Sequence, residues 1–272
     1  MQQILLPGTD LQTAPLGFGT ASLHHAVCSS DRQALLGAAL DAGFTHFDTA
    51  RMYGEGMAER ELGRFLVGQR QDVTIATKFG NPAIASFERV PTFLYAHRAL
   101  GGIGRRIWRD RWDQRSRLIS PDAAEQSLVR SLRALRTDWV DILFVHEPQI
   151  SEAGAVALLE DWLARQKTSG RVRYLGLAGN AQACAAIAQQ ADGLFDVLQV
   201  EDSLTTCEAD AVLAAGRPLQ ITFGYLRQAA VGVTPVDGVD VMRAALKRNA
   251  QGMVLVSSRR PERLQTLAAL AD

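Results

Sequence analysis

The sequence contains no cysteine pair and no residue cluster with the spacing of a metal site. Its three cysteines, Cys28, Cys184 and Cys207, are widely separated, so neither a disulfide framework nor a cysteine-based metal site is expected. His24 and His25 are adjacent, but a zinc ion needs further ligands that the pattern does not provide. We therefore expect free thiols and no bound metal.

Long apolar runs, a signal peptide and an excess of one charge are also missing. No uninterrupted apolar run approaches the ~18 residues of a membrane span. The segment Met1–Pro7 has neither the basic nor the apolar part of a secretory signal. Lys plus Arg and Asp plus Glu number 29 each, which argues against an electrostatic nucleic-acid binder. We expect a cytoplasmic protein without membrane or nucleic-acid partners. The pattern gives no indication of its oligomeric state.

What the sequence does contain is a regular alternation of short apolar runs and helical patterns. Hydrophobic residues make up 47% of the 272 positions, enough for one domain over residues 1–272. The expected strands are 15–19, 44–47, 73–77, 140–145, 172–177, 197–200, 219–223 and 253–256, and the expected helices are 31–42, 58–67, one starting at 120, 153–167, 181–190, 208–215, 239–249 and 261–270. Continuously apolar strands indicate a parallel sheet covered by helices. Eight such units in about 250 residues predict an α/β fold, a (β/α)8 TIM barrel.

The main competing fold is an open, doubly wound sheet. That fold needs a glycine-rich phosphate turn after an early strand, and Gly17-Phe18-Gly19 lacks the third glycine. Residues before the first strand are expected to form a β-hairpin that caps the barrel, with its turn at residues 7–10. Serine, proline and an acid at 120–122 predict a capped helix start.

A long insertion, residues 80–119, follows the third expected strand. It carries eight arginines and five large aromatic residues: Arg89, Arg98, Arg105, Arg106, Arg109, Arg111, Arg115, Arg117, Phe87, Phe93, Tyr95, Trp108 and Trp112. Long loops after barrel strands lie at the active-site face. We expect this insertion to bind a small carbonyl substrate that is anionic or aromatic. A solvated loop or a contact between copies is the alternative.

Four residues at or just beyond strand ends suggest proton transfer to a carbonyl oxygen. Asp48, Lys78 and His146 follow the second, third and fourth expected strands, and Tyr53 lies in the loop after Asp48. A barrel brings such positions together at one mouth. The Lys78 ammonium, held by Asp48, is expected to lower the pKa of Tyr53 from ~10, while His146 orients the carbonyl. A nicotinamide cofactor must supply the hydride, because no side chain can.

Each of these residues also has an ordinary structural interpretation. Asp48 could cap a helix, Tyr53 could serve packing, Lys78 could lie on the surface and His146 could be a satisfied core histidine. Their joint placement at successive strand ends favours the catalytic interpretation.

The same stretches resemble the aldo-keto reductase superfamily. The matching segments are residues 43–54, 58–63, 75–78 and 143–146, and the likeness runs from Leu16 to the last helix. The resemblance implies a (β/α)8 oxidoreductase that uses NADPH. It also implies that Tyr53 is the general acid, that Lys78 and Asp48 tune it, and that His146 orients the substrate.

The resemblance further implies a set of NADP-binding residues. These are Gly19, Thr20, Asp48, Asn180, Gln199, Phe223, Ser257, Ser258, Arg259 and Glu262. Gln199 would hold the carboxamide and Phe223 would stack on the nicotinamide. Residues 257–262 would bind phosphate at a helix N-terminus. The chain departs from the family at Asp202, where an aromatic residue is common, and at Ser257, which replaces a common glycine.

NADPH-dependent reduction of an aldehyde or ketone is the leading functional hypothesis. In the family, a serine and an asparagine after the fifth strand hold the carboxamide, and here only Asn180 remains, displaced behind Gly179. This weaker carboxamide site leaves two alternatives. One is a cofactor-independent lyase, dehydratase or isomerase that uses Tyr53 and Lys78. The other is a nucleotide-sensing regulatory subunit without turnover, since one fold can host many functions.

Overall fold

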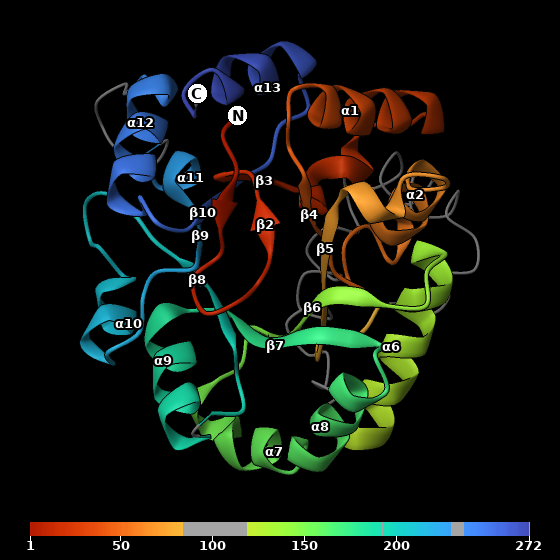
Figure 1. The fold of residues 1–272 in the computed structure, drawn as a ribbon, viewed down its shortest axis with the longest axis vertical. Coiled ribbons are helices and arrows are strands. Elements are labelled where there is room, and N and C mark those ends of the chain that lie inside the picture. Colours follow the sequence, from red (N-terminus) through yellow and green to blue (C-terminus); the bar gives the residue numbers. More distant parts are fainter. Residues whose placement is uncertain (84–118, 192, 230–236, 272) are drawn as a thin grey trace, which may run out of the picture.

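The computed structural model describes residues 1–83, 119–191, 193–229 and 237–271, and its centre is a closed barrel of parallel strands (Figure 1). The strands follow one another around the barrel in chain order, and the last closes on the first. They are β3 (Leu16–Gly19), β4 (His46–Asp48), β5 (Thr74–Phe79), β6 (Val140–His146), β7 (Val172–Gly179), β8 (Val197–Glu201), β9 (Ile221–Phe223) and β10 (Met253–Val256). The predicted (β/α)8 barrel is thereby confirmed.

Helices surround the barrel on its outside (Figure 1). They are α1 (Ser29–Asp41), α2 (Met57–Phe65), α6 (Pro121–Leu135), α7 (Ala153–Ala157), α8 (Glu160–Thr168), α9 (Ala181–Gln190), α10 (Asp210–Ala214), α11 (Tyr225–Ala229), α12 (Gly238–Arg248) and α13 (Pro261–Ala268), with short 3-10 turns at Thr20–His25, Arg70–Asp72 and Ile150–Glu152. The order of strand, helix and next strand brings every strand's carboxyl end to the same rim.

Two apolar layers hold this arrangement together. Alternate strand side chains such as Ile142, Phe144 and Met253 fill the barrel interior. The opposite faces pack against the helices and form the larger cluster, which includes Phe47 and Leu143. Because both faces are covered, most strands carry apolar residues on both faces, which is the pattern that the sequence displays.

The predicted N-terminal hairpin closes the amino end of the barrel. Strands β1 (Ile4–Leu5) and β2 (Gln12–Thr13) pair antiparallel. Leu6 and Leu11 flank the turn and join the interior cluster. Gln220, just before β9, donates from Nε2 to the Pro7 carbonyl at 2.7 Å. The barrel floor is therefore sealed, and a ligand must enter at the carboxyl rim.

The local elements differ from the predictions at three places. The helix expected over 31–42 begins earlier, at Ser29, and its N-cap residue Cys28 makes no side-chain cap bond. The expected helix 153–167 is divided into α7 and α8. The short helix α11 has no predicted counterpart. The Ser120 cap is confirmed, with its hydroxyl accepting from the Ala123 amide at 3.3 Å.

The predicted substrate-binding insertion falls mostly outside the described residues, which exclude positions 84–118. Within the described ranges, no helix is long and apolar enough to cross a membrane. The same part of the chain contains no cluster of three or more His, Cys, Asp or Glu side chains arranged to hold a metal ion.

Candidate active site

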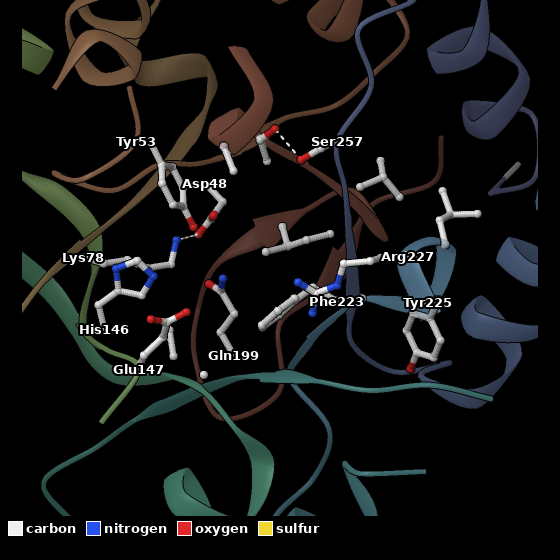
Figure 2. Close-up of a pocket in the computed structure, with 18 of the residues that line it drawn as sticks. Asp48, Tyr53, Lys78, His146, Glu147, Gln199, Phe223, Tyr225, Arg227 and Ser257 are labelled. Carbon is white, nitrogen blue, oxygen red and sulfur yellow. Dashed lines mark hydrogen bonds and ion pairs between the residues drawn. The ribbon is translucent and has the colours of Figure 1, made fainter. Parts of the chain in front are cut away.

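The carboxyl ends of the strands surround a cavity of about 410 Å³. Its lining includes all four predicted catalytic residues. The lining residues are Gly19, Ala21, Asp48, Met52, Tyr53, Lys78, His146, Glu147, Ala178, Gly179, Gln199, Phe223, Gly224, Tyr225, Leu226, Arg227, Met242, Leu255, Val256 and Ser257. The barrel thus brings together side chains from β4, β5, β6, β8 and β9, as Figure 2 shows.

Lys78 and Asp48 form a buried ion pair at the bottom of the cavity. Lys78 Nζ donates to Asp48 Oδ1 at 2.5 Å and to the Thr49 carbonyl at 2.9 Å. Their side chains are 1% and 4% exposed. Burial lowers the pKa of Lys78 and raises the pKa of Asp48, while each partner's charge opposes the shift of the other. A surface location for Lys78 is therefore excluded.

Tyr53 lies beside this pair and has a strongly perturbed pKa. The Lys78 ammonium is 5.1 Å from the centre of the phenol ring. We expected that charge to lower the pKa of Tyr53, and this expectation is wrong for the protein alone. Burial raises the pKa of Tyr53 well above 10, and the carboxylates of Asp48 and Glu147 raise it further. The phenol is therefore protonated at neutral pH and can donate a proton.

His146 lies against Tyr53 in the cavity lining. The two rings meet edge to face, with centroids 5.8 Å apart and planes at 81° (Figure 2). His146 ends β6 and is buried except for the edge that lines the cavity. The cavity in front of the two rings is thus bordered by a protonated phenol and an imidazole, which are groups that can hydrogen-bond one carbonyl oxygen.

The loop that carries Tyr53 is held by a buried arginine. Arg51 forms an ion pair with Glu59 of α2, and the Thr77 hydroxyl of β5 donates to the same carboxylate at 2.8 Å. Gly56 has φ +79°, and a side chain there would lie 2.9 Å from the Arg51 guanidinium. The sequence Arg51-Met52-Tyr53-Gly54-Glu55-Gly56 therefore supplies both the anchor and the left-handed backbone that the loop needs.

The opposite side of the cavity has the features of a nicotinamide site. The side chain of Gln199, at the end of β8, is buried, and its Oε1 atom accepts no hydrogen bond among the described residues. An unpaired buried carbonyl oxygen is costly, and the NH₂ of a carboxamide would satisfy it. Phe223 ends β9 with its ring partly exposed to the cavity, as stacking requires. These residues fit the predicted cofactor.

Gly19 and Ser257 line the cavity between these two sides. The Ser257 hydroxyl donates to the Gly19 carbonyl at 2.8 Å, which joins the ends of β10 and β3. Thr20 lies behind the cavity, where its hydroxyl donates to the Asp48 carbonyl at 3.0 Å. Thr20 therefore supports Asp48 and does not line the cavity itself.

Four other predicted cofactor residues lie outside the cavity lining. Asn180 caps α9, with Oδ1 accepting from the Ala183 amide at 3.0 Å. The Ser258 hydroxyl bonds to the backbone of Arg260. Arg259 and Glu262 are exposed where α13 begins. No side chain caps the N-terminus of α13, so this N-terminus fits an anionic group such as a phosphate.

Tyr225, two residues after Phe223, is bound into a polar network with Asp202. Its hydroxyl donates to Asp202 Oδ2 at 2.6 Å, and Arg248 Nε donates to the same oxygen at 2.6 Å. Asp202 is fully buried within this polar network. The aspartate that stands at a commonly aromatic position thus serves to hold Tyr225 and α12 in place.

Sequence reasoning missed two charged residues of the lining. Glu147 directly follows His146, and Arg227 lies in α11, where its guanidinium pairs with Glu201 of β8. The signal for Glu147 was available, because an acid immediately after a barrel strand lies at the active-site rim. The signal for Arg227 was not, because α11 itself was not predicted.

The comparisons with known proteins agree with this geometry. The model of the aldo/keto reductase family matches residues 15–212. A D-threo-aldose 1-dehydrogenase from a Pseudomonas species is 28% identical over 202 residues, covering 72% of this chain and 59% of the relative. An NADP(+) aldo-keto reductase from Schizosaccharomyces pombe is 28% identical over 218 residues, covering 76% and 55%. The chain thus spans somewhat over half the length of these curated relatives.

A solved structure extends the likeness to the whole fold. An aldo-keto reductase from Klebsiella pneumoniae in complex with NADPH superimposes with a TM-score of 0.71. It is 17% identical and covers 100% of this chain and 90% of that one. Since the family model spans most of the barrel, from β3 through α10, the chain belongs to the aldo/keto reductase family.

Proposed function

We propose that this protein reduces the carbonyl group of an aldehyde or ketone to an alcohol with NADPH as the electron donor. The observation that carries the proposal is the single cavity in which Tyr53, Lys78, Asp48 and His146 face the unpaired oxygen of Gln199. One half of this cavity suits proton donation, and the other suits a carboxamide.

The proton donor is Tyr53. A carbonyl oxygen that lies in the cavity in front of the Tyr53 hydroxyl and His146 accepts a hydrogen bond from each side chain. As negative charge develops on that oxygen, the phenolic proton moves to it, because an alkoxide is far more basic than a phenolate. The raised pKa of Tyr53 keeps this proton in place over the neutral pH range. Positioned acids of this kind contribute about 10²- to 10⁴-fold in rate.

Lys78 stabilises the phenolate that remains after transfer. Its ammonium is held by Asp48 and by the Thr49 carbonyl, so it is already in position and needs no rearrangement. Charge that is fixed in advance in a site of low dielectric constant lowers the barrier most effectively. Asp48 keeps the ammonium protonated despite its burial. Asp48 therefore acts through Lys78.

Residues of β8 and β9, together with those between β10 and the first turn of α13, are suited to bind NADPH. Gln199 would accept from the carboxamide, Phe223 would stack on the ring, and Ser257, Ser258, Arg259 and Glu262 at the start of α13 would lie near the phosphates. When bound, NADPH supplies the hydride that no side chain can provide. The relative from Schizosaccharomyces pombe carries NADP(+) in its name, and the Klebsiella pneumoniae structure contains NADPH. These likenesses support NADPH as the cofactor.

A titration of the protein with NADPH, followed by its fluorescence, tests the cofactor. We expect saturation in the low micromolar range. A panel of aldehydes and ketones, followed by NADPH absorbance, then tests turnover. Tyr53→Phe should abolish reduction and leave NADPH binding intact, because it removes one hydroxyl.

Three outcomes would contradict the proposed function or the role of Tyr53 in it. Full activity of Tyr53→Phe contradicts the role of Tyr53. Absence of NADPH binding to millimolar concentration favours a lyase, dehydratase or isomerase that needs no cofactor. Tight binding with no turnover across the panel favours a nucleotide-sensing subunit.

A further inference from the structure

Glu147 places a carboxylate on the substrate side of the cavity. It follows β6 directly and lines the cavity with its neighbour His146. Figure 2 shows its side chain on the same side as His146, directed toward the open space in front of Gln199. Glu147 is exposed, so this is a solvated charge at the place where a substrate would lie.

The backbone holds Glu147 in a fixed orientation. Its φ is +50°, in the left-handed region that residues with side chains disfavour. The Glu147 amide donates to the Ala178 carbonyl at 2.5 Å. Any side chain at Gly179 would lie 2.9 Å from Glu147 Cα, so the neighbouring strand leaves room for this turn. Residues that the surrounding structure holds in an unfavourable backbone conformation are common at functional sites.

The other charges of the described lining are already neutralised. Lys78 is paired with Asp48 at the cavity bottom. Arg227 lies on the Phe223 side and is paired with Glu201 (Figure 2). Glu147 accepts a hydrogen bond from the Asn81 amide at 3.1 Å, and no cationic side chain of the described residues forms an ion pair with it. A substrate bound against His146 therefore meets a net negative charge from the described residues.

This charge also reaches the reacting groups. It raises the pKa of Tyr53, after burial and Asp48, and it opposes the burial-driven decrease in the pKa of Lys78. Glu147 lines the same cavity as Tyr53 and Lys78, so it lies close to where the substrate's carbonyl oxygen would be. A second negative charge on the substrate would be repelled at that distance.

We propose that Glu147 selects substrates by charge. It disfavours carbonyl compounds that carry a carboxylate or phosphate and favours those that offer an ammonium or hydroxyl group to its carboxylate. This inference rests on the proposed carbonyl reduction and names its substrate class. The anionic substrate expected from the arginines of the insertion stays a prediction, because positions 84–118 lie outside the described residues, and the experiment below decides between the two.

Matched aldehydes test the selection. The value of kcat/KM is measured for 4-(trimethylammonio)benzaldehyde and 4-carboxybenzaldehyde, and the ratio of the cationic to the anionic value is compared between variants. Intrinsic reactivity cancels in this comparison. Glu147→Gln should lower the ratio about tenfold, as removal of one charge at a few ångströms predicts. Glu147→Lys should lower it further and reverse the preference.

Glu160→Gln is the matched control. Glu160 begins α8, lies outside the cavity lining and changes the total charge equally. Its ratio should equal that of the unmodified protein. An unchanged ratio in Glu147→Gln, or an equal fall in Glu160→Gln, overturns the proposal.

Binding of the two corresponding benzyl alcohols separates this proposal from the proposed function. Their dissociation constants, measured by ligand-observed NMR, do not depend on turnover. If no aldehyde is reduced and NADPH does not bind, the proposed function fails while the Kd ratio still decides the role of Glu147. Tighter binding of the cationic alcohol, lost in Glu147→Gln, supports selection. Equal binding of both alcohols, or no binding of either, overturns it.

Discussion

The Lys78 ammonium lies 2.5 Å from the Asp48 carboxylate inside the carboxyl end of the barrel. Adjacent strands, β5 and β4, supply the two residues, and the register between these strands brings their ends together. Both charges are withdrawn from water, so each depends on the other. The pair therefore links the stability of the barrel to the position of the cation beside Tyr53.

Asp48→Asn should destabilise the protein by about 3–5 kcal/mol, because it leaves a buried ammonium without its counter-charge. Urea unfolding measures this loss. The double variant Asp48→Asn/Lys78→Met removes both charges and should recover much of the stability. Additive losses in the double variant would show that the pair is not coupled.

The raised pKa of Tyr53 predicts different pH profiles for the two directions of the reaction. Reduction needs the phenol, which is protonated throughout the neutral range, so its kcat/KM should stay level from pH 6 to 9. Alcohol oxidation needs the phenolate, so its kcat/KM should rise with pH, about tenfold per unit. Steady-state kinetics in both directions measure this. A plateau in the oxidation profile near neutral pH would contradict the assignment.

Gln199→Met should weaken both cofactor binding and stability. The variant removes an oxygen that has no partner among the described residues, but also an amide that hydrogen-bonds the buried Asp48 carboxylate, so the free energy of unfolding should fall by about 1.5–3 kcal/mol. The Kd for NADPH should rise about tenfold, because a hydrogen bond of about 1.4 kcal/mol would be lost. NADPH fluorescence and urea unfolding give the two quantities. Unchanged NADPH affinity would remove Gln199 from the cofactor site.

His46 should make the protein sensitive to acid. It is buried in the barrel beside Thr74, and burial, with the nearby Lys78 charge, lowers its pKa from 6.5 to about 3. Below pH 6.5 the unfolded chain binds a proton at His46 that the folded protein does not. His46 therefore does not lower the free energy of unfolding above pH 6.5. Below that pH the free energy of unfolding decreases as the pH falls toward 3, by about 3 kcal/mol at pH 4.

A variant without the titrating group isolates this effect. His46→Gln keeps a hydrogen-bonding side chain next to Thr74 and cannot titrate. Its unfolding free energy should fall less steeply between pH 6.5 and pH 4, as urea unfolding at several pH values would measure. An equal slope in both proteins would assign the acid sensitivity to other groups.

The barrel and the four central residues could be predicted from the sequence because both depend on local patterns. Apolar runs mark buried parallel strands, and the residue at the end of each run must lie at the common rim. Asp48, Lys78 and His146 follow from that rule alone. Tyr53 needed the resemblance as well, because a loop residue has no position fixed by a strand.

The remaining features depend on contacts that no local pattern records. Asn180 caps α9, and Tyr225 turns to Asp202 because Arg248 of the distant helix α12 completes that network. The direction of the pKa shift of Tyr53 reflects burial and two carboxylates, Asp48 at the end of β4 and Glu147 just after β6. A pKa shift depends on every charge and on the burial around the group in the folded protein. The positions of strand ends in the sequence therefore predict which residues meet in the site, but not their pKa values.

Transfer of a labelled hydride tests the central claim most directly. The protein is incubated with an aldehyde of the panel and NADPH that carries deuterium at both C4 positions of the nicotinamide, and the product is examined by mass spectrometry. The account predicts an alcohol with one deuterium on the former carbonyl carbon. Recovery of unlabelled alcohol, or of unchanged aldehyde across the whole panel, would contradict it.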